Sequence, residues 1–220
     1  MGMRFAVVGL GRIGARTAKE LVKRGHHVVG IDKFADGSTS IPDKYDVHRC
    51  EISHKDEMIR LMKGSDAVFN AISPNLEHPE TYGVFITSIM SQTKKAGVPR
   101  LLSVIGSSSA LVNTGERLVY SDYFDETNRI FYLNICESEE LYSKEKELDW
   151  GCITPPAFME NPEPVRRQYR KRYDGHIVAL NDSSPCYWEV SWISLSDFAF
   201  ACADELEMPT VHRQRVCIGY

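Results

Sequence analysis

The chain has 220 residues, of which 43% are hydrophobic and 25% charged, and its formal net charge is −4. A chain of this length buries most of the surface of its unfolded state, so it needs neither a metal nor disulfides to form a core. The weak negative charge argues against a general binder of nucleic acids, and no apolar stretch is long enough to cross a membrane.

The first predicted element is a short apolar strand, Arg4–Val8, which leads directly into a glycine-rich turn. A helix over Ala15–Arg24 follows, Gly25 stops it, and a second strand covers His27–Ile31 and ends at Asp32. Strand, G-x-G-x-x-G, helix, strand and acid in this order are the full context of a dinucleotide-binding fingerprint. The start of the chain therefore predicts a nucleotide site.

Each glycine of this turn has its own physical task. Gly9 permits the tight turn, Gly11 lets the backbone approach a pyrophosphate, and Gly14 lets the helix pack closely on the strand. The phosphates would bind free N–H groups at the positive end of the helix. The predicted cofactor-binding residues of the turn are Gly9, Leu10, Gly11, Arg12, Ile13 and Gly14. A glycine turn without a ligand is the alternative, and it leaves this spacing unexplained.

The side chains beside the turn bear on the choice of cofactor. Asp32 would accept hydrogen bonds from an adenosine ribose, and it would repel a 2′-phosphate. Arg12 and Lys33 could instead hold that phosphate. We therefore expect NAD(H) or NADP(H), with NAD(H) favoured.

Strands and helices alternate along the rest of the chain. Strands are predicted at Val47–Cys50, Asp66–Ile72, Leu101–Ile105, Trp150–Thr154 and Arg215–Ile218, with short ones at His176–Leu180 and Trp188–Ile193. Helices are predicted behind a capping box at Ser53–Asp56, over Pro79–Ala96, over Asn128–Lys146, and behind a second capping box at Ser194–Asp197.

The strands are continuously apolar, which is typical of a parallel sheet covered on both faces. The predicted fold is an α/β, Rossmann-type doubly wound sheet in one domain. Residues 1–154 would form the dinucleotide-binding core, and residues 155–220 a small substrate lobe with a closing helix and strand. Ligands bind beyond the carboxyl ends of such strands, which adds Ala71 and Ile72 to the predicted cofactor contacts.

The cysteines and histidines indicate in which redox compartment the protein works and whether it binds a metal. The six cysteines form no C-x-x-C pair, and several lie in apolar segments, as small buried hydrophobes do in a reducing compartment. The seven histidines show no ligand spacing, so no metal site is expected. The N-terminus lacks the pattern of a signal peptide. We expect a cytoplasmic protein.

The second half of the chain resembles the atypical short-chain dehydrogenase/reductases, in particular the NmrA-like and NADH-flavin reductase-like group that includes biliverdin reductase B. The resemblance rests on Lys94–Leu102, on Leu148–Trp150 with Thr154–Asn161, and on Ile193–Ala199. The order of these segments is more specific than any one of them. The turn departs from that group's G-x-x-G-x-x-G by one residue, and Thr154 replaces its arginine.

The resemblance also implies a catalytic site. It places the Tyr-x-x-x-Lys pair at Tyr132 and Cys136, so the tyrosine is kept and the lysine is lost. Tyr142–Lys146 matches the same letters at the wrong end of the helix, and we interpret it as a decoy. A phenol without a neighbouring cation is a poor base, which disfavours alcohol oxidation.

Four further residues follow from the resemblance. Ser107 and Ser108 fall near the catalytic serine of the group, and loop solvation is the alternative for both. Pro155 would lie against the nicotinamide, or it only stops a strand. Glu51 would replace the acid near the adenine, or it belongs to a solvated loop.

These features favour an NAD(P)H-dependent oxidoreductase, a flavin reductase-like enzyme that passes hydride to a flat small-molecule acceptor such as a flavin or quinone. A non-catalytic NmrA-like dinucleotide sensor is the first alternative. The second is an RCK-type regulatory subunit of potassium transport, which Phe5–Gly14 and Gly30–Asp32 resemble. The basic run Arg166–Tyr173 is interpreted as a solvated loop, so nucleic acid is not an expected partner. The sequence is also compatible with a homodimer.

Overall fold

The computed structural model describes residues 2–36, 44–75, 77–122, 124, 126–160, 165–179 and 191–220. Its main sheet has eight strands in the order β3-β2-β1-β4-β5-β6-β10-β8. They are β1 (Arg4–Val8), β2 (His27–Asp32), β3 (Tyr45–Arg49), β4 (Ala67–Asn70), β5 (Arg100–Val104), β6 (Asp149–Thr154), β8 (Arg170–Arg172) and β10 (Gln214–Gly219). All neighbours pair in parallel except β10 and β8. This confirms the predicted doubly wound, mostly parallel sheet.

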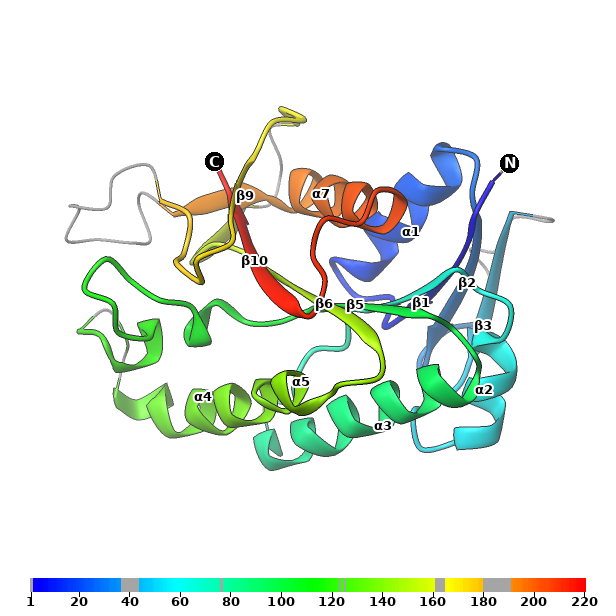
Figure 1. Cartoon of the computed structure of the whole chain (residues 1–220), viewed down its shortest axis with the longest axis horizontal. Helices are drawn as coiled ribbons and strands as arrows, with labels where there is room; N and C mark the ends of the chain where they lie inside the picture. Colours follow the sequence, from blue (N-terminus) through cyan, green and yellow to red (C-terminus); the bar gives the residue numbers. More distant parts are fainter. Residues whose placement is uncertain are drawn as a thin grey trace.

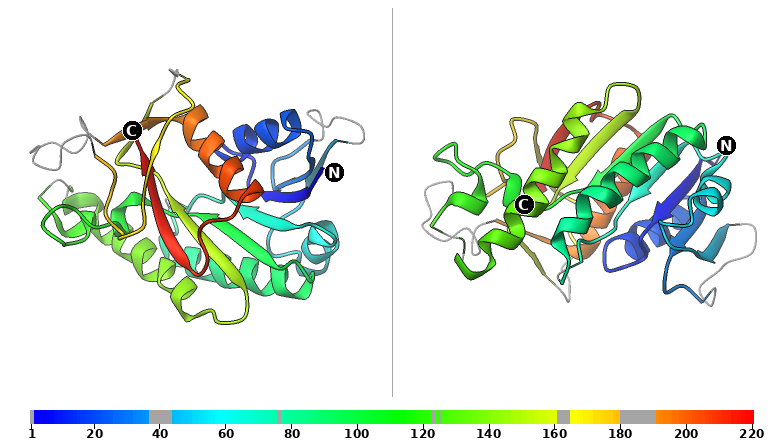
Figure 2. Two further views of the ribbon diagram at one scale, coloured as in Figure 1. Left: turned by 45° about the horizontal axis from the view of Figure 1, so that its top comes forward. Right: turned by 90° about the horizontal axis from the view of Figure 1, so that it is seen from below.

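Helices cover both faces of the sheet, as the continuously apolar strands require. In Figure 1, α1 (Gly14–Lys23) and α7 (Leu195–Glu207) lie above the sheet. Below it lie α2 (Lys55–Met62), α3 (Tyr82–Lys95), α4 (Glu126–Glu139) and the short α5 (Leu141–Lys144), a row that Figure 2 shows from beneath. Each face has its own buried apolar cluster.

Short elements complete the chain. Single 3-10 turns occur at η1 (Pro79–Thr81), η2 (Ser107–Ser109) and η3 (Leu118–Tyr120). A separate pair of parallel strands, β7 (Phe158–Glu160) and β9 (Trp192–Ser194), lies outside the main sheet. No helix in the described ranges combines the length and apolar composition that a membrane crossing requires.

The two predicted capping boxes have different outcomes. Ser194 is the N-cap of α7, and its hydroxyl accepts the N–H of Asp197 at 3.0 Å, which confirms that prediction. The box at Ser53 is wrong, because α2 starts after His54 and has no side-chain cap. The Ser53 hydroxyl instead lies 3.5 Å from the Glu51 carboxylate, a local side-chain bond that competes with capping.

Other differences lie in the second half. The helix predicted over Asn128–Lys146 is interrupted at Glu140, which separates α4 from α5. The predicted strand at His176 is only a single bridge to Leu111, while Leu180 and residues 188–190 lie outside the described residues. Strand β8 was not predicted, because its residues are basic rather than apolar.

Asp197 holds the start of the basic run Arg166–Tyr173. Its fully buried carboxylate accepts the N–H groups of Arg166 and Arg167 at 2.8 and 2.9 Å, and the hydroxyl of Tyr220. Burial favours the neutral acid, but these hydrogen bonds outweigh it and hold the pKa of Asp197 below its ordinary value. The Arg166 guanidinium stacks on the rings of Trp192 and Tyr220.

Candidate functional site

The turn between β1 and α1 leaves no room for side chains at two of its glycines. Gly9 has a φ of +89°, and a Cβ there would lie 2.9 Å from the carbonyl of Ala71 and the nitrogen of Ile72. A Cβ on Gly14 would lie 1.8 Å from the carbonyl oxygen of Gly9. At Gly11 a Cβ would meet nothing within 4 Å, so the backbone is bare toward the cavity described next.

The start of α1 has no side-chain cap, although the N–H of Ala15 donates to the carbonyl oxygen of Gly11 at 3.1 Å. Its N-cap, Ile13, provides no side-chain hydrogen bond, and its first turn holds no acidic residue. The first N–H groups of a helix have no intrahelical acceptor, and the helix dipole favours negative charge there. This geometry suits a diphosphate against the bare backbone of Gly11.

Asp32 is held in place at the carboxyl end of β2. One carboxylate oxygen accepts the N–H of Leu10 at 2.7 Å, and the other accepts the N–H of Phe34 at 2.8 Å. Each carboxylate oxygen has a further lone-pair site, so both can still accept a hydroxyl hydrogen. The two bonds fix the acid beside the glycine turn with its charge toward the cavity.

A cavity of about 820 Å³ extends from the glycine turn over the carboxyl ends of β1, β2 and β4. Seven of the predicted cofactor contacts line it, namely Gly9, Gly11, Asp32, Lys33, Glu51, Ala71 and Ile72. Leu10 supports Asp32 from behind, and Arg12 is exposed beside the turn. The volume is in the usual range for small-molecule sites.

The cavity also has apolar walls that the sequence did not predict. Ile52 and Met58 contribute from the end of β3 and from α2, Phe85 from α3, and Phe34 follows Asp32. Phe34 is 80% exposed, with the Lys33 ammonium 4.8 Å from its ring centre. Phe34 and Ile52 come shortly after the ends of β2 and β3, which is their only sequence signal, whereas Met58 and Phe85 lie within α2 and α3 and have no such signal.

The predicted catalytic serines lie after β5, outside this cavity. Ser108 is buried, and the Cys136 thiol on α4 lies 3.5 Å from its hydroxyl oxygen. Burial raises the pKa of Cys136 to about 11, so this thiol is neutral at pH 7. Ser107 is half-buried, and its side chain is nearer solvent. The position aligned with the lysine therefore does contact the serine turn.

Tyr132 and Pro155 are the other site residues that the resemblance implies, and Tyr142 is the tyrosine that the sequence analysis sets aside. Tyr132 is half-buried on α4 and packs edge-to-face on Phe124 and Phe131, and Pro155 is buried directly after β6. Tyr142, which the sequence analysis interprets as a decoy, is fully buried, and its hydroxyl donates to the Ser103 hydroxyl at 2.8 Å. Burial raises the pKa of Tyr142 well above its ordinary value.

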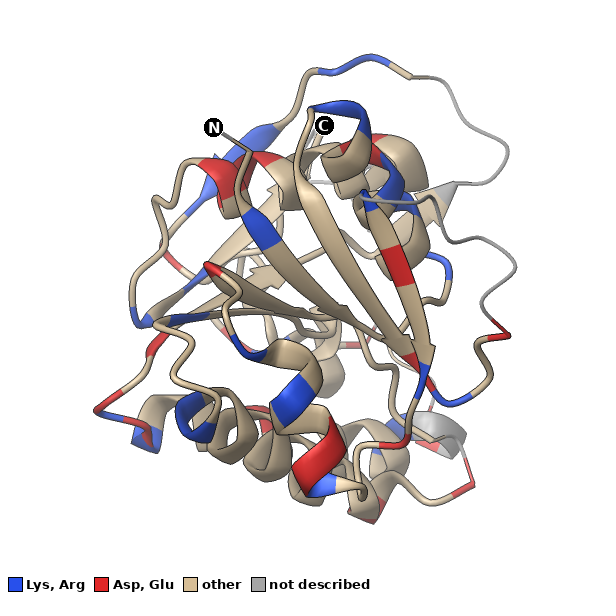
Figure 3. Cartoon of the chain, turned by 90° about the vertical axis from the view of Figure 1, so that its right-hand side faces the viewer, with Lys and Arg blue, Asp and Glu red and all other residues tan. Residues whose placement is uncertain are grey.

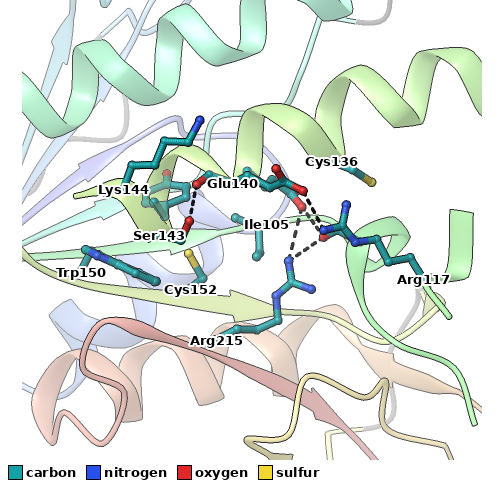
Figure 4. Close-up of a pocket in the computed structure, with 12 residues that line it drawn as sticks. Ile105, Arg117, Cys136, Glu140, Ser143, Lys144, Trp150, Cys152 and Arg215 are labelled. Atoms are coloured by element: carbon teal, nitrogen blue, oxygen red, sulfur yellow. Dashed lines mark hydrogen bonds and ion pairs between the residues drawn. The ribbon is translucent and has the colours of Figure 1, made fainter. Parts of the chain in front are cut away.

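A second cavity, of about 400 Å³, lies between α4, α5 and the strands β6 and β10. Figure 4 shows Arg215 extending from β10 toward α4, and Arg117 approaching from the loop before η3. Arg117 pairs with Glu140 at 2.7 Å, and Arg215 lies 3.5 Å from Glu139. Sequence reasoning missed this group, because its members are far apart along the chain.

Charges on the side of the molecule that carries β3 and α2 are mixed. Figure 3 shows Lys and Arg interspersed there with Asp and Glu, without a single basic face. On α2, for example, Arg60 pairs with Glu57 one turn away. Among the described residues on this side, charges of both signs are therefore interspersed.

Residues 9–205 match the family described as NAD(P)H-binding. The chain belongs to this NAD(P)H-binding family. The uncharacterized protein YwnB of Bacillus subtilis (strain 168) is 29% identical over 222 residues, which cover 98% of each chain. The match includes both the glycine turn and the second half of the chain, so the family assignment does not depend on the fingerprint alone.

Solved structures of NAD(P)H-binding and related Rossmann proteins share the whole fold. A candidate epimerase from Bacteroides thetaiotaomicron has a TM-score of 0.84 and 29% identity, covering 100% of this chain and 98% of its own. A candidate NADH-flavin reductase from Streptococcus pneumoniae has a TM-score of 0.80 and 22% identity, covering 99% of both chains. The second likeness shows the fold alone. NAD(P)H fits the large cavity, since Gly11, the start of α1 and Asp32 present the donors and acceptors that its diphosphate and ribose require.

Proposed function

We propose that this NAD(P)H-binding protein is a reductase that passes hydride to a flat acceptor such as a flavin or a quinone. The observation that carries the proposal is the contact of Cys136 with Ser108, at the position where the resemblance expects a lysine. The bound cofactor would supply the hydride. The chain would hold both partners and exclude water.

The proposal follows from the neutral residue at position 136, where the resemblance expects a lysine. Cys136 is a neutral thiol, so it cannot lower the pKa of a nearby phenol as a lysine would. Tyr132 can then donate a hydrogen bond, but it is a poor base for removing a hydroxyl proton. An acceptor that takes hydride readily needs alignment more than it needs acid–base catalysis.

The test is turnover of NADH and NADPH by the purified protein with flavins, quinones and enones. We expect oxidation of the nicotinamide only when an acceptor is present. Gly11→Ala is the control, because its Cβ would occupy open space on the path of the diphosphate and should abolish turnover without unfolding the chain. Absence of turnover across all three acceptor classes would contradict the proposal.

The cysteine at position 136, where the resemblance expects a lysine, also favours a second candidate, a non-catalytic dinucleotide sensor. A sensor needs the large cavity but no acid–base pair. It would bind the dinucleotide in calorimetry without transferring hydride to any acceptor, and binding would alter its affinity for a partner protein. The RCK-type interpretation has only the N-terminal segment in its support, whereas the NAD(P)H-binding match continues to residue 205.

A further inference from the structure

A buried carboxylate lies one helical turn from Cys136 on α4. Glu139 is 5% exposed and reaches into the turn that follows β5. One oxygen accepts the N–H of Gly106 at 2.7 Å, and the other accepts the hydroxyl of Ser109. A single side chain thus fixes both ends of the turn that carries Ser107 and Ser108.

Arg215 joins the same group from β10. Its Nη2 donates to the Ser109 hydroxyl at 2.6 Å and lies 3.5 Å from the Glu139 carboxylate. Glu139, Ser109 and Arg215, with the N–H of Gly106, are called the serine-turn clamp below. The clamp ties together three elements that are distant in sequence, β5, α4 and β10.

The clamp is close to the predicted catalytic hydroxyl. A Cβ placed on Gly106 would have the Ser108 oxygen at 3.4 Å on one side and a Glu139 oxygen at 3.5 Å on the other. The Ser108 hydroxyl in turn contacts the thiol of Cys136. Movement of the Glu139 carboxylate would therefore move the turn at the point where Ser108 begins.

We infer that Glu139 is the positioning residue of the reductase site, and that it sets the geometry of the Ser107–Ser108 turn against the nicotinamide end of the cofactor. This inference rests on the proposed function. With a thiol instead of a lysine at position 136, no ammonium at that position orients the hydroxyls of the turn. The buried carboxylate, held by Arg215, does so through hydrogen bonds.

A Glu139→Gln substitution separates positioning from folding. The amide keeps the size of the side chain and one acceptor for Gly106, but it presents a donor to Ser109 or leaves Arg215 unpaired. Glu140→Gln is the matched control, because it makes the same change on the next residue, whose carboxylate is half-exposed and pairs with Arg117. Ser109→Ala is the second variant, since it removes one hydroxyl and keeps the pair of Glu139 with Arg215.

The readouts are the fluorescence of bound NADH, its dissociation constant and kcat with the best acceptor. For Glu139→Gln we expect the fluorescence of bound NADH to move toward that of free NADH, and kcat to fall about tenfold or more while the dissociation constant changes less than about threefold. Glu140→Gln should match the unsubstituted protein. Ser109→Ala should change the NADH fluorescence and kcat in the same direction as Glu139→Gln. If Glu139→Gln does not fold, Ser109→Ala alone tests the inference.

The inference is overturned if Glu139→Gln and Ser109→Ala lower thermal stability but leave the NADH fluorescence and kcat equal to those of Glu140→Gln, because the clamp is then only structural. If the unsubstituted protein turns over no acceptor, the proposed function fails. The fluorescence comparison still decides whether Glu139 positions the turn.

Discussion

The Cα of Gly14 lies against the carbonyl oxygen of Gly9, so close that a Cβ would stand 1.8 Å from that oxygen. We expect Gly14→Ala to destabilise the protein by about 2–3 kcal/mol and to abolish NAD(P)H binding, because helix α1 must move away from the turn. Gly11→Ala should keep the melting temperature and lose only affinity, since its Cβ meets no atom. Thermal unfolding and titration with NADH measure both; equal loss of stability in the two variants would contradict this account.

Asp32 should decide between the two nicotinamide cofactors. Its carboxylate is fixed toward the cavity by the N–H groups of Leu10 and Phe34, so it would repel a 2′-phosphate. We expect tighter binding of NADH than of NADPH, and roughly tenfold tighter NADPH binding in Asp32→Asn, in which the charge is removed at constant size. In calorimetry, Lys33→Met should weaken the binding of NADPH and leave the binding of NADH unchanged. An unchanged NADH to NADPH ratio in Asp32→Asn would show that another residue selects the cofactor.

The thiol of Cys136 should be unreactive in the native protein. Since burial raises its pKa to about 11, almost no thiolate is present at pH 8, and thiolate is the form that iodoacetamide alkylates. We expect peptide mass spectrometry to find Cys136 unlabelled in native protein and labelled after denaturation. Labelling at similar rates in both states would mean that the turn beside Ser108 opens readily.

The two tyrosines of the catalytic resemblance should have opposite effects. Tyr142→Phe removes a buried hydroxyl that bonds to Ser103, and we expect a loss of about 1–2 kcal/mol of stability with unchanged turnover. Tyr132→Phe should keep stability and lower kcat by about tenfold, the small effect of a hydrogen-bond donor that is not an activated base. Chemical denaturation and steady-state kinetics test the pair. A large loss of turnover in Tyr142→Phe would return that residue to the site.

Acid should weaken the contact between α3 and the segment before β6. Lys94 lies 2.8 Å from Glu145 and lowers the pKa of that carboxyl to about 2, well below its unfolded value near 4.5. Because the folded pKa is the lower one, this stabilisation is present above pH 4.5 and is lost as the pH falls toward 2. Glu145→Gln should cost about 1–2 kcal/mol at pH 7, since water partly screens the pair, and this cost should shrink as the pH falls toward 2.

Glu147→Gln is the control for that experiment, because Glu147 also contacts Lys94 but its side chain is 80% exposed. Urea denaturation at several pH values should give a flat difference between Glu147→Gln and the unsubstituted protein. A pH-independent effect of Glu145→Gln would assign its contribution to packing instead.

Local patterns were sufficient for the parts of the fold that depend on nearby residues. The strands β1 and β2, helix α1 and the cap at Ser194 were predicted because each follows from a short run of apolar residues, a stop glycine or one side-chain bond. The cap predicted at Ser53 failed because Glu51, only two residues away, offers its hydroxyl another partner. Side-chain competition of this kind is not visible in a motif.

The sequence by itself determined the class of sheet, the glycine turn and the acid that follows it, since steric exclusion at Gly9 and Gly14 acts within a few residues of the chain or at the adjacent strand end. Only the tertiary structure revealed the apolar walls of the large cavity and the meeting of Glu139 with Ser109 and Arg215. Those groups come from separate elements, and the order of the strands decides which of them become neighbours. A carboxylate is identified as buried and bonded only once the packing around it is known.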